Sequence, residues 1–225
     1  MYNNDKFKAL PVSRNNMARK TKEDAERTYH ALLDAATKLF IHQGIAKTTL
    51  NDIATAAAMT RGAIYWHFDN KDAVIRALWE RNASTLHDAF TTELKHLDRD
   101  DPAEHFRRIM KELVQSVVNQ PELGQAIRIV MHSVEFTDEQ TELQRFLNAK
   151  HVELHSTMEQ AFATLKKRKA LKTSLSSTLL SQGFMSYLLG LIHIYLEPGI
   201  KKLDLKKSGD QLLDLFLDPI LARTE

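Results

Sequence analysis

Residues 48–68 read TTLNDIATAAAMTRGAIYWHF, and this stretch decides how the N-terminal part of the chain folds. Thr49 is placed to cap a first short helix, and Asp52, three residues later, completes a capping box. Thr60 is placed to cap a second short helix after a brief turn. Two short helices joined in this way predict a helix-turn-helix over about 49–68, a unit that inserts its second helix into the major groove of DNA.

The two short helices separate small and apolar residues from polar and aromatic ones. Alanines let the helices cross closely, and the apolar residues expected in their shared core are Ile53, Met59, Ile64 and Phe68. The second helix keeps an exposed face suited to phosphates and base edges, made of Arg61, Gly62, Tyr65, Trp66 and His67. Tyr65 and Trp66 also fit a second interpretation, as aromatic residues of the core.

Apolar residues recur at helical spacing through nearly the whole chain, which predicts an all-α protein. The chain holds only 7 glycines and 5 prolines, and it has no Asn-Gly or Asp-Gly hairpin signal. Outside the motif we expect a first helix that ends at Gly44 and further helices at about 71–97, from 102, from 121, 138–168, 173–196 and 211–217.

Charge is spread unevenly along the 225 residues, although the formal net charge is only +2. Residues 1–81 carry 13 Lys and Arg against 9 Asp and Glu, whereas the remainder is mildly acidic. A basic end on an acidic body favours a DNA-binding head, although a solvated basic tail would give the same balance. The chain has no cysteine and no secretory signal, and its most apolar stretch, 175–196, is interrupted by polar residues; we therefore expect a cytoplasmic protein without a membrane span.

The motif lies within a longer pattern that resembles the TetR family of bacterial regulators, and in particular its AcrR-type multidrug-efflux repressors. The matching residues keep the spacing of the family, without insertion or deletion. They are 17–22 (MARKTK), 33–36 (LDAA), 39–40 (LF), Gly44, 48–49 (TT), 53–54 (IA), 60–68 (TRGAIYWHF) and 70–71 (NK). The resemblance implies a partly disordered basic arm at 1–25, a three-helix DNA-binding domain at 26–86, and a larger helical domain for ligand binding and dimerisation at 87–225.

The resemblance also implies a role for individual residues of the head. Arg61 and Gly62 match positions that reach base edges. The positions that match phosphate contacts are Thr48, Thr49, Thr60, Tyr65, Trp66, His67 and Lys71. Two features depart from the family pattern: Ala58 stands where the turn usually has glycine, and 16 residues precede Met17, where the family usually starts.

For the body, the resemblance implies an apolar pocket for a small lipophilic inducer and a homodimer interface built from the last two long helices. The predicted pocket residues are Trp79, Phe106, Met110, Val114, Met131, His132, Glu135, Phe136 and Phe146. The predicted interface residues are Leu154, Met158, Leu165, Leu179, Gly183, Ser186, Tyr187, Gly190 and Ile194. Each set also fits ordinary packing inside one protomer.

The sequence therefore predicts a repressor that binds a near-palindromic operator in double-stranded DNA, is released by a lipophilic molecule, and controls a multidrug efflux operon. A regulator of fatty-acid, quorum-signal or catabolic genes with the same fold is the nearest alternative. A sequence-indifferent nucleoid protein fits poorly, because the body is acidic. A metal-dependent helical enzyme fits worse still: His151 and His155 lack a third ligand, no catalytic motif is present, and no metal or cofactor is expected.

Overall fold

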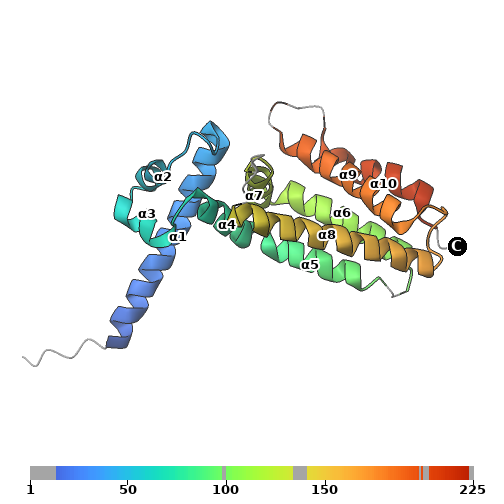
Figure 1. Ribbon diagram of the computed structural model, residues 1–225, viewed down its shortest axis with the longest axis horizontal. Coiled ribbons are helices and arrows are strands. Elements are labelled where there is room, and N and C mark those ends of the chain that lie inside the picture. Colours follow the sequence, from blue (N-terminus) through green and yellow to red (C-terminus); the bar gives the residue numbers. More distant parts are fainter. Residues whose placement is uncertain (1–13, 98–99, 134–140, 198, 200–202, 223–225) are drawn as a thin grey trace, which may run out of the picture.

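The computed structural model describes residues 14–97, 100–133, 141–197, 199 and 203–222, with side chains from Lys22 onward. These residues form ten helices and one isolated β-bridge, so the all-α prediction is confirmed. The helices are α1 (Arg14–Gln43), α2 (Leu50–Ala56), α3 (Arg61–His67), α4 (Lys71–Asn82), α5 (Ser84–Lys95), α6 (Pro102–Asn119), α7 (Pro121–Met131), α8 (Glu142–Lys167), α9 (Ser177–Leu196) and α10 (Leu205–Ile220). Figure 1 shows α1–α3 as a small head beside an elongated body, with α4 leading from one to the other.

The head has a hydrophobic core of its own. Leu32 and Leu33 from α1, Ile53 from α2 and Ile64 from α3 are fully buried in it. The same core takes in Ile129 from α7 and Leu143 from α8, which lie beyond the boundary expected near residue 86. Head and body therefore share packed side chains and have no sharp boundary between them.

The single helix expected over 71–97 is two helices, which is a correction to the sequence prediction. The chain departs from helical geometry at Ala83, where φ is −123° and ψ is −24°. Neither glycine nor proline marks this position. The hydroxyl of Ser84 donates to the carbonyl of Glu80 at 2.6 Å, and such back-bonding to the preceding turn bends helices.

The body is a bundle of α5–α10 around an aromatic cluster. Phe106, Phe162 and Phe184 come from three different helices and are fully buried, with ring centroids 5.2–6.1 Å apart. The last helix begins at Leu205 rather than near residue 211, as the sequence had indicated. By length and apolar composition α9 would suit a membrane span, but core helices of globular proteins pass the same test, and α9 packs into this bundle.

Candidate nucleic-acid interface and ligand cavity

Hydrogen bonds at both caps of the helix-turn-helix match the sequence prediction. The Thr49 hydroxyl accepts from the Asp52 amide, and the Asp52 carboxylate accepts from the Thr49 amide at 2.8 Å, so the capping box is complete. The backbone hydrogen bond from Thr49, followed by its hydroxyl, lowers the pKa of Asp52. Thr60 caps α3 by accepting from the Ala63 amide at 3.2 Å. These bonds fix where each helix begins, and with it the rotation of α3.

The turn between the two helices has the left-handed conformation that glycine usually adopts. Ala58 has a φ of +55°, while the Met59 amide donates to the Ala54 carbonyl and the Ala58 amide to the Thr55 carbonyl. This pair of bonds is a Schellman motif, whose left-handed residue is most often glycine. The turn therefore forms with alanine, at the cost of backbone strain.

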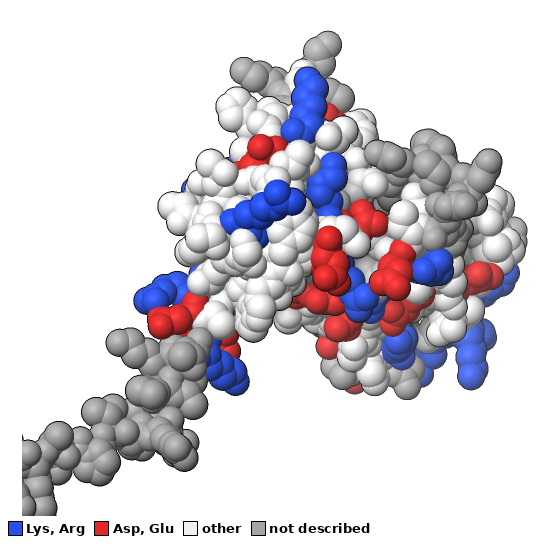
Figure 2. Space-filling model, turned by 60° about the vertical axis from the view of Figure 1, so that its left-hand side comes forward, with Lys and Arg blue, Asp and Glu red and all other residues white. Residues whose placement is uncertain are grey.

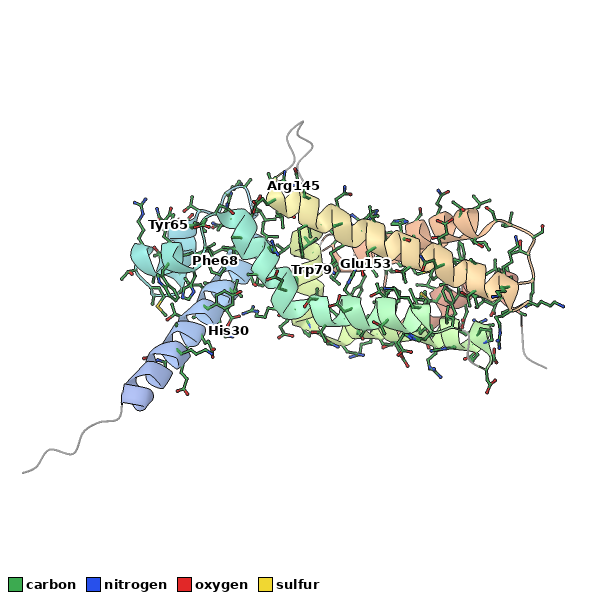
Figure 3. The ribbon with its side chains drawn as sticks, turned by 60° about the horizontal axis from the view of Figure 1, so that its bottom comes forward. His30, Tyr65, Phe68, Trp79, Arg145 and Glu153 are labelled. Carbon is green, nitrogen blue, oxygen red and sulfur yellow. The ribbon has the colours of Figure 1, made fainter. Side chains whose placement is uncertain are left out.

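Helix α3 turns its polar and aromatic face to solvent. Trp66 is 73% exposed and Tyr65 is 44% exposed, so neither is a core residue. The guanidinium of Arg61 lies 5.4 Å from the centroid of the Tyr65 ring, and Gly62 is exposed beside it. Phe68 points the other way: it is 4% exposed and stacks on Tyr29 of α1. Figure 3 shows Tyr65 and Phe68 in the head.

Two of the predicted phosphate contacts have surroundings that the sequence did not indicate. Thr48 is fully buried, and its hydroxyl donates to the Gly44 carbonyl at 2.8 Å, so it holds the loop after α1 and has no free surface for DNA. The His67 ring packs against Tyr29 and Trp66, and burial lowers its pKa. Burial therefore disfavours the charged form of this imidazole in the free protein.

Basic side chains surround this face. Lys71 begins α4 and donates to the Ile45 carbonyl, and Lys47 is exposed just before the capping box. Lys47 was not predicted as a DNA contact, although its positive charge directly precedes Thr48 and Thr49 in the sequence. Figure 2 shows basic side chains spaced over a largely uncharged head surface, whereas acidic and basic residues mix over the body. This distribution suits the DNA backbone.

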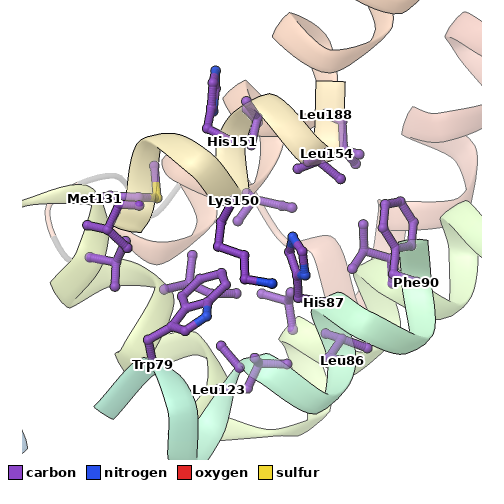
Figure 4. Close-up of a pocket in the computed structure, with 18 of the residues that line it drawn as sticks. Trp79, Leu86, His87, Phe90, Leu123, Met131, Lys150, His151, Leu154 and Leu188 are labelled. Carbon is purple, nitrogen blue, oxygen red and sulfur yellow. The ribbon is translucent and has the colours of Figure 1, made fainter. Parts of the chain in front are cut away.

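A cavity of about 520 Å³ lies in the body, bounded by α4–α9. Most of its lining is apolar, with Trp79 from α4, Phe90 from α5 and Leu188 from α9 among the contributors (Figure 4). Volume and lining match those of sites for drug-sized molecules. The polar residues in the lining are His87, Gln144, Asn148, Lys150 and His151, none of which was predicted from the sequence.

The structure places only two of the predicted pocket residues, Trp79 and Met131, in the lining of this cavity. Three others, Phe106, Met110 and Val114, are fully buried in the body core, because α6 turns a different face, with Leu113 and Val117, to the cavity.

The remaining four predicted pocket residues also lie elsewhere. Phe146 packs against the head core, with the Arg76 guanidinium 4.7 Å from its ring centroid. His132 pairs with Glu197. Glu135 and Phe136 lie outside the described residues.

Comparison with known proteins connects the head and the cavity to one family. A family model for bacterial regulatory proteins of the tetR family matches residues 32–78. A second model, for the C-terminal region of MAATS-type transcriptional repressors, matches residues 101–221 and thus more than half of the chain. The chain belongs to the TetR family of bacterial transcriptional regulators. As the sequence predicted, it is a DNA-binding repressor with an N-terminal helix-turn-helix and a helical C-terminal domain.

Several TetR-family relatives match over nearly their whole length. TtgR of Pseudomonas putida is 32% identical over 92% of this chain and 100% of its own. AcrR of Shigella flexneri is 31% identical over 91% of this chain and 94% of its own. Among solved structures, NalD, the secondary repressor of the MexAB-OprM multidrug efflux pump in Pseudomonas aeruginosa, superposes with a TM-score of 0.77, at 30% identity over 90% of this chain and 100% of NalD. SmeT of Stenotrophomonas maltophilia, in a complex with triclosan, gives 0.70 at 28% identity, over 87% and 92% of the two chains.

The predicted dimer residues of this TetR-family repressor divide into buried and exposed sets. Met158 and Leu165 are fully buried within the protomer, and Leu154 lines the cavity. Tyr187 is half-buried, and its hydroxyl donates to the Leu212 carbonyl at 2.6 Å. The exposed residues of α9 in this set are Leu179, Gly183, Ser186 and Ile194, and Gly190 is half-buried. Val152 of α8, which was not predicted, is 60% exposed.

Proposed function

We propose that this protein is a homodimeric repressor of a multidrug efflux operon and that a lipophilic molecule in the cavity releases it from its operator. The observation that supports this proposal most strongly is the likeness to NalD, a repressor of a multidrug efflux pump, because it covers 90% of the chain and so includes the C-terminal domain that holds the cavity. Likeness in the head alone would say nothing about the inducer. The protein would act in the bacterial cytoplasm, where its operator lies.

At the DNA end, the exposed face of α3 would enter the major groove. Arg61 is the donor suited to a base edge, and Gly62 lets the backbone approach closely. The caps Thr49 and Thr60, with Tyr65, Trp66 and Lys71, would hold phosphates on either side. Two heads related by twofold symmetry need half-sites about 34–36 Å apart, which makes the operator a near-palindrome.

Two copies of the protein would form the dimer through the exposed parts of α8 and α9. Leu179 is 52% exposed and Val152 is 60% exposed, large values for apolar side chains. Gly183 and Ser186 are small and exposed, which allows a partner helix to come close. A symmetric contact of four helices would cover these residues.

Helix α4 would connect the ligand with the DNA-binding face. Lys71 at its first residue belongs to the head, and Trp79 near its other end lines the cavity. Eight residues of helix separate them by about 12 Å. A ligand that fits the cavity only when α4 is displaced would change the spacing of the two heads and weaken operator binding.

The proposal is tested with the purified protein and the promoter fragments of its own and neighbouring genes. We expect tight, salt-dependent binding to a near-palindrome beside an efflux-pump operon, measured by fluorescence anisotropy, and release by lipophilic compounds. Deletion of the gene should raise the pump transcript. A protein that binds no fragment of this region, or whose deletion leaves pump transcripts unchanged, would contradict the proposal.

A further inference from the structure

Two residues that line the cavity each carry a buried polar atom that the protein leaves without a partner. In the described part of the chain, Trp79 Nε1 and His87 Nε2 are the two buried side-chain nitrogen or oxygen atoms that lack a hydrogen bond. Both residues line the same cavity, and the centroids of their rings lie 5.8 Å apart. His87 is only 9% exposed. Because buried polar groups are normally satisfied, two unpaired atoms on residues of one cavity make this corner the place where a ligand could supply hydrogen-bond partners.

The two unpaired atoms need opposite partners: one needs a hydrogen-bond acceptor and the other a donor. An indole Nε1–H can only donate. The other nitrogen of His87, Nδ1, lies 3.2 Å from the Asp88 carboxylate, and an ionised carboxylate only accepts, so Nδ1 carries a proton. In the neutral ring, Nε2 is therefore an acceptor. A hydroxyl group answers both needs, because its oxygen accepts from Trp79 and its proton is donated to His87.

The charges around this polar corner disfavour a cationic ligand. Lys150 lines the cavity and reaches between Trp79 and His87, as Figure 4 shows. Its ammonium lies 3.2 Å from Glu153 and 3.6 Å from Asp88, and neither of these carboxylates lines the cavity. No Asp or Glu is among the described lining residues. A cationic ligand would thus lose its hydration without a carboxylate in the cavity lining to pair with it. A full anion gains little either, because Lys150 is already paired.

We propose that the cavity selects lipophilic hydroxyl compounds, such as phenols, whose oxygen is held between Trp79 Nε1 and His87 Nε2. This inference rests on the proposed function of the cavity as the inducer site and adds the chemical class of the inducer. The apolar walls bind the hydrocarbon part of the molecule, and the polar corner orients it.

The test compares three probes that share a biphenyl body by isothermal titration calorimetry at pH 7: 4-phenylphenol, 4-methoxybiphenyl and a 4-biphenylyl trimethylammonium salt. We expect the phenol to bind about tenfold or more tighter than the ether, since the ether cannot donate to His87, and the ammonium to bind most weakly. Calorimetry is chosen because one variant below removes the tryptophan reporter.

Two variants assign the preference to the polar corner. Trp79→Phe keeps an aromatic ring and removes the donor, and His87→Leu removes the acceptor. Each should reduce the ratio of phenol affinity to ether affinity to less than about threefold. In the matched control, Leu113→Met, both affinities should shift together and the ratio should persist. A ratio that survives in both corner variants would overturn the assignment.

The outcomes separate this inference from the proposed function. Equal binding of phenol and ether, or tighter binding of the ammonium compound, would overturn hydroxyl selection while leaving an inducer site in place. A protein that binds its operator but none of the three probes would overturn the lipophilic inducer site and this inference together. Hydroxyl-dependent binding that also releases operator DNA would support both.

Discussion

The ammonium of Lys71 donates to the carbonyl of Ile45 over 2.9 Å, which joins the first residue of α4 to the loop between α1 and α2. The two residues are 26 positions apart in the chain. Lys71 therefore has a structural task in addition to the phosphate contact that the family resemblance implies. An ammonium has three donors, so the bond to Ile45 leaves two of them for DNA.

Lys71→Met should affect both stability and DNA binding. Loss of the bond to Ile45 should lower the free energy of unfolding by about 1 kcal/mol. Loss of the phosphate contact should weaken binding to all sequences alike and reduce the slope of log K against log salt by about one unit. Lys167→Met, which removes an exposed charge at the end of α8, is the control. A changed stability with an unchanged salt slope would leave Lys71 with its structural role only.

Arg61→Ala should reduce discrimination between operator and non-operator DNA. Arg61 is exposed at the first position of α3, where a guanidinium can reach a guanine edge, so its loss should cost about 1–3 kcal/mol of specific binding. Non-specific binding should change much less. Competition titrations measure both, with Arg108→Ala on α6 as a charge-matched control far along the chain. Full retention of specificity would show that α3 does not read the bases through Arg61.

Much of the fold could be predicted from the sequence because its signals are local. The caps at Thr49 and Thr60 and the proline at the start of α6 act within a single turn of helix, and the structure has all three. The break at Ala83 could not be predicted, because nothing in the residue itself disfavours a helix. It depends on a side-chain bond from Ser84 and on packing in the body.

Of the two candidate sites, the DNA-binding face could be predicted from the sequence much better than the lining of the cavity. The DNA-binding face follows from the rotation of one short helix, so Tyr65 and Trp66 could be placed once Ile64 was assigned to the core. Pocket residues depend on how six helices are rotated against one another. Phe106 and Leu113 lie on different faces of α6, and composition alone does not tell which face meets a cavity. The polar residues His87 and Lys150 mark the cavity only once the fold brings them together.

Ala58→Gly should stabilise the head. With a φ of +55°, Ala58 holds a left-handed conformation that glycine adopts without strain, so we expect a gain of about 0.4–1 kcal/mol in urea unfolding. Ala57→Gly is the matched control, because Ala57 has a φ of −83° and should gain nothing. If both variants lost stability equally, the turn would not be strained.

Gly190→Trp should disrupt the dimer without disturbing the fold of the protomer. A Cβ at Gly190 would meet nothing within 4 Å, so the new side chain would project from α9 toward the proposed partner. We expect monomers in sedimentation velocity, native helix content, and loss of tight operator binding. Ala89→Trp, at an exposed position of α5, is the control and should remain dimeric. A dimeric Gly190→Trp protein would remove this part of α9 from the interface.

Ligand and operator should weaken each other's binding by the same factor. Because α4 carries both Lys71 and Trp79, the proposed mechanism makes a ligand in the cavity and DNA at α3 competitors for the position of this helix. An inducer that prefers the DNA-incompetent state about a hundredfold, about 2.7 kcal/mol per coupled site, would release the operator effectively. Linkage then requires operator DNA to lower ligand affinity equally. Quenching of Trp79 fluorescence measures this in a Trp66→Phe background, since Trp66 is exposed on the DNA-binding face. A compound that releases DNA yet binds equally well with and without operator would exclude coupling through α4.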